Sequence, residues 1–188
     1  MKILIVDNYD SFTYNLAGLI NTITGKRPEV ERNDTIDLDK VAAYDKILLS
    51  PGPGVPAEAG KLIALIEAYA PSKSILGVCL GHQAIGQVFG AQLHNLSQVC
   101  HGIATPVTPL KDDVLFRGIG AAFDAGRYHS WVVDKKDFPD SLIVTAEDEQ
   151  GYIMALRHEY YDVSGIQFHP ESVLTPQGKQ IMTNWLFQ

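Results

Sequence analysis

The sequence predicts an α/β fold, in which an open, mostly parallel sheet carries helices on both faces. In the first half of the chain, short apolar runs rich in Val, Ile and Leu alternate with amphipathic stretches, which is the pattern of βα units. In the second half, short strand candidates follow one another between turns and extend the sheet with antiparallel and mixed strands. With 188 residues, 46% of them hydrophobic, the chain can bury one sizeable core, and we expect a single domain over residues 1–188.

Strands and helices alternate through the first half. We predict strands at residues 2–6, 28–32, 46–50 and 74–78, and helices at residues 12–23, 37–43, 57–69 and 80–89. Asp10 or Ser11 is a candidate N-cap of the first helix, and Gly25 is its stop signal. Each helix therefore connects two strands of a growing parallel sheet.

The second half reads as strands at residues 103–108, 123–128, 142–147, 152–157 and 163–168, closed by a helix at 175–186. In open α/β sheets the ligand site lies off the carboxyl ends of the strands. We expect the functional residues of this chain at that edge.

The balance of charge excludes several partners. The formal net charge is −7, and no cluster of Lys or Arg offsets it locally, so neither nucleic acid nor an anionic membrane is an expected partner. The apolar run at the N-terminus meets Asp7 too early for a signal peptide, and nowhere do eighteen apolar residues follow one another. We therefore expect a cytoplasmic protein whose two cysteines stay reduced.

Cys79 stands between Gly77 and Gly81, where a buried strand is predicted to turn into a helix. This is the pattern of a nucleophile elbow, in which the glycines allow a tight turn and the thiol is presented above the sheet. The positive end of the following helix favours the thiolate. The alternative is a buried structural cysteine, but the flanking glycines favour the nucleophile. Cys100 has no such setting and is expected to be a small packed side chain.

A thiolate needs a base and a group that orients the base. Pro170 biases His169 towards an extended conformation, which places His169 and Glu171 on one face as a base and its carboxylate partner. His129 is the main competitor for the role of base, whereas His82 is too close to Cys79 on the same helix.

Acyl transfer also needs hydrogen-bond donors for a developing oxyanion. The loop at 51–54, Pro-Gly-Pro-Gly, directly follows a strand and is a candidate for one donor, and the amide of Leu80 is a candidate for the second. No set of His, Cys, Asp and Glu has the spacing of metal ligands, so we expect no metal.

Three segments together resemble the signature blocks of the class I, or triad, glutamine amidotransferases: PGPG at 51–54, GVCLGHQ at 77–83 and QFHPES at 167–172. Two more blocks, DNYDSF at 7–12 and RYHS at 127–130, narrow the resemblance to the amidotransferase subunits that serve chorismate-using synthases. These subunits are anthranilate synthase component II and the glutaminase subunit of 4-amino-4-deoxychorismate synthase. The resemblance spans nearly the whole chain.

The resemblance implies a flavodoxin-like sheet, L-glutamine as substrate and no cofactor. Cys79 would form a glutamyl thioester, His169 would act as general base and then acid, and Glu171 would orient it. The residues implied in substrate binding are Gly52 and Leu80 for the oxyanion and Gln83, Ser130 and Trp131 for the α-amino and carboxylate groups.

The same resemblance implies a partner. A chorismate-binding synthase subunit, component I, would receive the ammonia in a hetero-oligomer, with Asn8, Tyr9, Asp10 and Ser11 at the interface. We expect the anthranilate synthase of tryptophan biosynthesis, with the aminodeoxychorismate synthase of folate biosynthesis, or service to both, as the alternative. Since the sequence shows no fused synthetase domain, the partner is expected to be another polypeptide.

The sequence departs from the relatives in two places, with Cys100 where Met is frequent and Trp131 where Leu is usual. If position 131 contributes only its backbone, neither departure affects catalysis. Two other classes of function stay open: a cysteine hydrolase or peptidase on the same sheet, and a non-catalytic binding subunit. Cysteine hydrolases and peptidases usually lack the segments around Gln83 and His129. The intact set of Cys79, His169 and Glu171 argues against a non-catalytic binding subunit.

Overall fold

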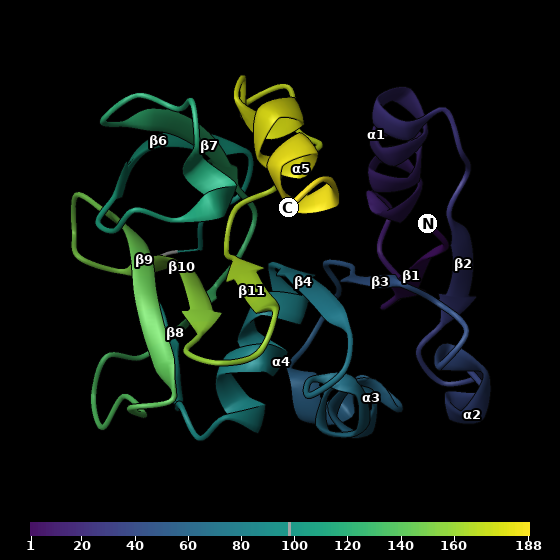
Figure 1. The fold of residues 1–188 in the computed structure, drawn as a ribbon. Helices are drawn as coiled ribbons and strands as arrows, with labels where there is room; N and C mark the ends of the chain where they lie inside the picture. The colour runs from purple at the N-terminus through teal and green to yellow at the C-terminus, as the bar shows by residue number, and fades with distance from the viewer. Residues whose placement is uncertain (98) are drawn as a thin grey trace.

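The computed structural model describes residues 1–97 and 99–188, and its central feature is a sheet with helices on both faces (Figure 1). The strands of this sheet are β1 (Ile3–Asp7), β2 (Glu29–Arg32), β3 (Lys46–Leu49), β4 (Ser74–Val78), β6 (Ile103–Pro109), β7 (Phe123–Arg127), β9 (Leu142–Asp148), β10 (Ile153–His158) and β11 (Val163–Ile166). The helices are α1 (Thr13–Thr24), α2 (Leu38–Val41), α3 (Leu62–Tyr69), α4 (Leu80–Val88) and α5 (Gly178–Leu186). Two further strands, β5 (Leu93–Asn95) and β8 (Trp131–Val133), pair separately.

Among the described residues the main sheet has nine strands in the order β2-β1-β3-β4-β11-β10-β9-β6-β7. The first five run parallel, and each pairing from β11 onwards is antiparallel. The order confirms the predicted parallel sheet extended by antiparallel strands. Because β1, β3, β4 and β11 are neighbours and parallel, the segments that follow them meet at one edge of the sheet.

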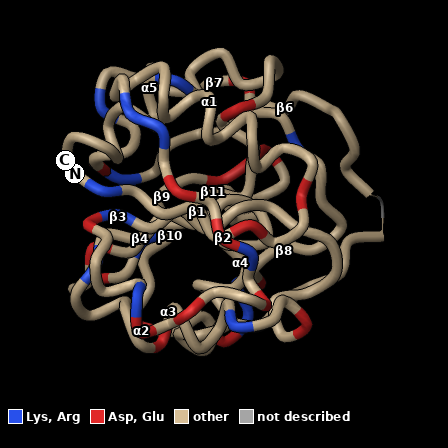
Figure 2. Tube along the Cα trace, turned by 90° about the vertical axis from the view of Figure 1, so that its right-hand side faces the viewer, with Lys and Arg blue, Asp and Glu red and all other residues tan. Residues whose placement is uncertain are grey.

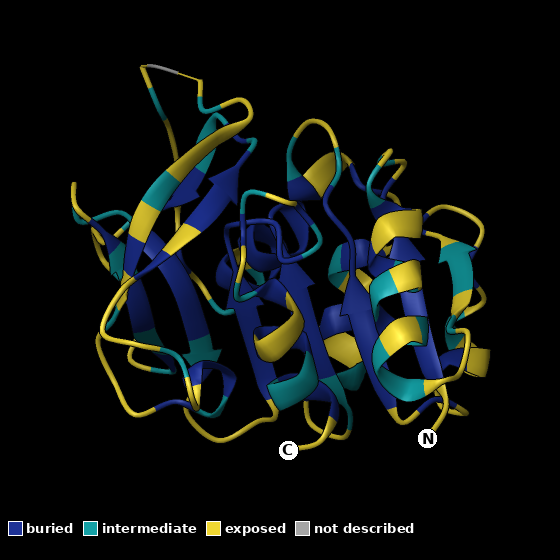
Figure 3. Ribbon diagram, turned by 90° about the horizontal axis from the view of Figure 1, so that it is seen from above, coloured by how far each residue is buried: buried dark blue, intermediate teal, exposed yellow. Residues whose placement is uncertain are grey.

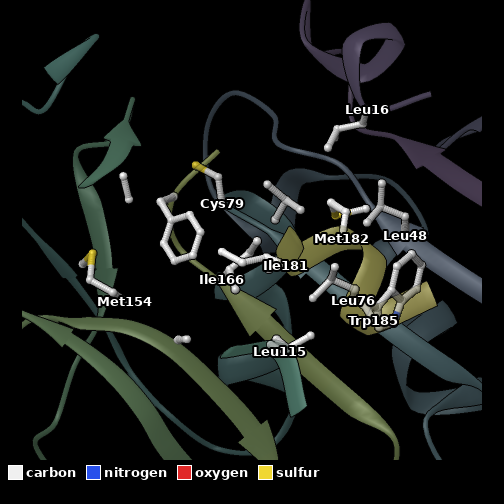
Figure 4. Packing of buried hydrophobic residues seen from close by; sticks show 14 of the residues in the cluster. Leu16, Leu48, Leu76, Cys79, Leu115, Met154, Ile166, Ile181, Met182 and Trp185 are labelled. Carbon is white, nitrogen blue, oxygen red and sulfur yellow. The ribbon is translucent and has the colours of Figure 1, made fainter. Parts of the chain in front are cut away.

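The helices form two layers. Strand residues alternate between the faces: Ile3 and Ile5 of β1 pack in the core with α1 and α5, whereas Leu4 and Val6 pack with α2, α3 and α4. Figure 1 shows α1 and α5 on one side of the sheet and the other three helices on the opposite side. Figure 3 shows the consequence, with buried strands between helices whose outer faces are exposed. Figure 4 shows part of the first core, in which Cys79 lies among apolar side chains.

Several predicted boundaries differ from those observed. The predicted N-cap of α1 is wrong: the cap position is Phe12, which makes no side-chain cap bond, and the carboxylate of Asp10 accepts the Phe12 amide at 2.7 Å. The predicted stop at Gly25 is confirmed, because this residue is left-handed (φ 70°) and its amide bonds to the Asn21 carbonyl.

The predicted helix at 57–69 starts later than expected. Its first residues form a 3-10 turn (Pro56–Glu58), and α3 begins only at Leu62. Gly60 separates the two with a φ of 55°, and a Cβ there would lie 2.8 Å from the Asn33 carbonyl oxygen. A second 3-10 turn (Val114–Phe116) and the short strands β5 and β8 were not predicted.

Charged residues of both signs are interspersed along the chain trace (Figure 2), in keeping with the acidic composition and with the lack of a basic cluster in the sequence. Among the described residues, no helix combines the length and the apolar character that crossing a membrane requires.

Candidate active site

Cys79 occupies a strained turn between β4 and α4. Its φ of 52° and ψ of −100° are rare for a residue with a side chain, and its amide donates to the Ile166 carbonyl at 2.9 Å. The flanking glycines are required by contact: a Cβ on Gly77 would lie 2.4 Å from the Gly81 carbonyl, and one on Gly81 would lie 2.5 Å from the Leu49 oxygen. The chain therefore makes the sharp strand-to-helix turn that its glycines predict.

His169 and Glu171 lie beside one another after β11. The His169 Nδ1–H donates to Glu171 Oε1 at 2.6 Å, and both side chains are almost fully buried. Burial alone lowers the pKa of His169, but hydrogen bonding to Cys79 and Glu171, together with their negative charges, raises it to about 10. These interactions favour the protonated imidazole of His169 at neutral pH.

Since Nδ1 is engaged by Glu171, Nε2 is the ring nitrogen left for Cys79. Nε2 is buried and makes no hydrogen bond of good geometry in the resting chain. Catalytic hydrogen bonds are often loose until substrate binds, so this poor alignment is compatible with a histidine close enough to Cys79 for the cysteine to raise its pKa.

Backbone and aromatic contacts fix the position of His169. Its amide donates to the Gly126 carbonyl at 3.0 Å, and its carbonyl accepts the Thr175 hydroxyl at 2.7 Å, which in turn accepts the Gly126 amide. Phe12 approaches the imidazole edge-on at 5.4 Å between ring centroids, and Tyr128 lies at 4.8 Å. His169 is therefore held by its main chain and shielded by two rings.

The loop at 51–54 lies against the start of α4. A Cβ on Gly52 would lie 2.7 Å from a methyl group of Leu80 and 2.6 Å from the Cβ of Asn8, so only glycine fits there. Leu80 is the first residue of α4, so its amide has no partner within the helix. The two predicted oxyanion residues are thus brought into contact beside Cys79.

Asn8 is a buried structural residue, contrary to its predicted place at a partner interface. It is 2% exposed, and its backbone and side-chain nitrogens donate to Ser50 at 2.8 Å each. The neighbouring Tyr9 and Ser11 are exposed and Asp10 is half-buried. Tyr9, Asp10 and Ser11 therefore form the surface of this loop, and the side chain of Asn8 lies beneath it.

Gln83 faces the segment that contains Ser130 and Trp131. Its side-chain nitrogen donates to the Trp131 carbonyl at 2.9 Å and to Gln167 Oε1 at 3.1 Å. The Ser130 carbonyl accepts the Leu96 amide at 2.7 Å. Both backbone carbonyls of the predicted binding segment are therefore engaged within the protein.

The other candidate histidines are neutral. Burial and the charge of Arg127 lower the pKa of His129 to about 3, and burial lowers that of His82 to about 4. Both nitrogens of His129 are engaged, by Arg127 and by the Trp131 carbonyl. These bonds and this low pKa favour His169 over His129 as the base. Cys100 is a half-buried free thiol.

Several residues at the site had no role predicted from the sequence, including Phe12, Tyr128 and Gln167. Arg127 and Asp148 form a buried ion pair at 2.6 Å next to His129. The sequence signal that could have pointed to Arg127 is a charged residue near the end of a predicted strand. Within residues 1–97 and 99–188, no group of three or more His, Cys, Asp or Glu side chains could hold a metal ion.

A cysteine on a strand-to-helix turn, with a histidine–carboxylate pair at the same edge of a parallel sheet, is the arrangement of cysteine-dependent acyl-transfer enzymes of the α/β class. The family model described as glutamine amidotransferase class-I matches residues 4–188, and the chain belongs to this family.

Two names occur among the similar proteins of known sequence. Anthranilate synthase component 2 of Thermus thermophilus is 46% identical, with 99% of this chain and 92% of that protein covered. Aminodeoxychorismate synthase component 2 of Klebsiella aerogenes is 44% identical, with 98% of each chain covered. Among solved structures, a putative GMP synthase protein from Thermoplasma acidophilum aligns with a TM-score of 0.88 at 25% identity, over 99% of this chain and 92% of that one. A glutamine amidotransferase from Thermotoga maritima shares the fold, with a TM-score of 0.74 at 16% identity over 99% and 96% of the two chains.

Proposed function

We propose that this chain, as one domain over residues 1–188, hydrolyses L-glutamine with Cys79 as nucleophile and His169 and Glu171 as its base and orienting carboxylate. The observation that supports this most strongly is the buried 2.6 Å bond between His169 and Glu171 beside the cysteine at the elbow. The thiolate attacks the side-chain amide carbon of glutamine. As the tetrahedral intermediate collapses, His169 gives its proton to the leaving nitrogen, ammonia departs and a γ-glutamyl thioester remains.

Hydrolysis of the thioester uses the same residues in reverse. Neutral His169 takes a proton from water, which attacks the thioester carbon, and the thiolate leaves as glutamate forms. The amides of Gly52 and Leu80 donate to the oxyanion in both steps. Their contact beside Cys79 supports this role.

Recognition of the amino-acid part of glutamine falls to Gln83 and the segment at Ser130 and Trp131. The Gln83 nitrogen is already engaged by protein acceptors, so its Oε1 is the atom suited to the α-ammonium group. The backbone amides of Ser130 and Trp131 are assigned to the α-carboxylate, because an N–H donor matches a carboxylate acceptor and the Trp131 carbonyl fixes this segment against Gln83.

We further propose that the ammonia passes to a chorismate-binding synthase subunit, component I, in a cytoplasmic hetero-oligomer. Names of similar proteins support two products: anthranilate, our first choice, and aminodeoxychorismate. The loop of exposed Tyr9, half-buried Asp10 and exposed Ser11 is the proposed contact, since it continues from the buried Asn8 beside Gly52.

The test uses the chain together with its purified synthase partner. Cys79→Ser is expected to abolish product formation from chorismate and glutamine while leaving formation from chorismate and ammonium salt intact. Cys100→Ser is the matched control and should retain both activities. Identification of the product as anthranilate or aminodeoxychorismate decides between the two synthases, and glutamine-dependent turnover by Cys79→Ser would refute the assigned nucleophile.

A further inference from the structure

Arg127 is buried at the end of β7, although Arg is costly to remove from water. It is 3% exposed, and its Nη1 pairs with Asp148 Oδ2 at 2.6 Å, with both side chains almost fully covered. The other oxygen of Asp148 accepts the amides of Gln150 and Tyr152. Since a buried ion pair adds little net stability over an apolar pair, its presence calls for a further role.

Arg127 determines which nitrogen of His129 carries the proton. The Arg127 Nε–H donates to His129 Nε2 at 3.1 Å, so Nε2 is the unprotonated acceptor. The proton is therefore on Nδ1, which donates to the Trp131 carbonyl at 2.9 Å. Without Arg127, either ring nitrogen of His129 could carry the proton. Arg127 therefore selects the tautomer whose Nδ1–H donates to the Trp131 carbonyl.

The Trp131 carbonyl is also the acceptor for Gln83. Its second hydrogen bond comes from Gln83 Nε2 at 2.9 Å, and the same nitrogen donates to Gln167 Oε1 at 3.1 Å. With both hydrogens of this amide engaged, the amide cannot flip without losing two bonds. Gln83 stands four residues after Cys79, so the chain of contacts runs from β9 to the helix of the nucleophile.

We propose that Arg127 is a positioning residue for glutamine binding, which acts through His129 and the Trp131 carbonyl to hold the Gln83 amide with its Oε1 free for the substrate ammonium. The inference rests on the proposed function, because it assigns Gln83 to the substrate. A positioning role and a purely structural role predict different effects of substitution at Arg127. Loss of a structural residue lowers the stability of the fold, whereas loss of a positioning residue raises the KM for glutamine more than it lowers kcat.

The kinetic test compares Arg127→Met and His129→Phe with the wild-type chain in glutaminase assays with the synthase partner. We expect the KM for glutamine to rise about 10- to 100-fold, the range for a lost hydrogen bond to a charged group, while kcat changes less than about threefold. Arg157→Met is the matched control, because it removes another Arg–Asp pair, with Asp113, outside this network. Its KM should equal that of the wild type.

The spectroscopic test is independent of activity. In protein labelled with 15N-histidine, one buried neutral imidazole is expected to carry its proton on Nδ1 at pH 7, and Arg127→Met should abolish this preference. If Arg127→Met does not fold, Arg127→Lys serves instead, because it keeps a charge beside Asp148 but cannot also donate through Nε. A folded variant with wild-type KM, or a wild-type His129 protonated on Nε2, overturns the proposal. Absence of any glutaminase in the wild-type complex would instead refute the proposed function.

Discussion

Gly178→Ala is predicted to inactivate the enzyme from a position outside the active site. Gly178 begins α5, and a Cβ there would lie 1.8 Å from the Pro170 carbonyl oxygen, about 1.6 Å short of the 3.4 Å at which ordinary contacts begin. Because the obstacle is backbone, either α5 or the segment between His169 and Glu171 must move. A displacement of about 1 Å at a catalytic group can cost on the order of 100-fold in rate.

The assay is steady-state glutamine hydrolysis by the complex, with thermal unfolding measured in parallel. We expect kcat/KM for glutamine to fall by about 100-fold, mostly through kcat, because the displaced groups are the base and its carboxylate partner. Gly18→Ala is the control: nothing lies within 4 Å of its added Cβ, so activity should be unchanged and the helix stabilised by up to about 1 kcal/mol. A folded Gly178→Ala enzyme with kcat within twofold of wild type would refute the reasoning.

Glu171→Gln should slow single-turnover thioester formation less than His169→Asn, since the imidazole still accepts a proton when imperfectly held; equal losses would contradict this division of roles. Stability should fall as pH drops from 6.5 towards 4, because His82, with a pKa of about 4 in the fold against 6.5 when unfolded, binds its proton only in the unfolded chain. At pH 5 the contribution of His82 alone is about 2 kcal/mol in urea unfolding, and His129 acts in the same direction. His82→Leu should therefore reduce this pH dependence without abolishing it, whereas the exposed His94→Gln should not change it. Substitutions at Tyr9 and Asp10 should weaken binding of the synthase partner, measured by calorimetry. If the affinity for the partner and the stimulation of glutaminase activity by the partner are both unchanged, this loop is not part of the interface.

Much of the fold follows from local patterns. The parallel strands β1, β3 and β4 are continuous apolar runs, and Gly77 and Gly81 predict the turn at Cys79. The pairing of His169 with Glu171 was predicted, but for a reason that the structure does not bear out: the prediction assumed an extended chain, whereas these residues lie in a turn in which the Ser172 amide bonds to the His169 carbonyl. Strands β5 and β8, of three residues each, carry too little pattern to detect.

What the sequence could not predict depends on contacts between distant segments. Arg127 and Asp148 meet because β6 pairs with both β7 and β9, and no local pattern encodes that register. Asn8 belongs to a polar block that reads as a surface loop, yet it is buried because Ser50, at the end of β3, accepts the hydrogen bonds from both of its nitrogens. The delayed start of α3 depends on the close approach of Gly60 to Asn33.

Mapping the covalent intermediate tests the central claim most directly. The complex is mixed with glutamine, quenched in acid within a single turnover, digested and examined by mass spectrometry for a γ-glutamyl adduct. The account predicts an adduct on the peptide that contains Cys79, which forms more slowly in His169→Asn and is absent in Cys79→Ser. An adduct on Cys100, or glutamine turnover with normal acylation in His169→Asn, would contradict it.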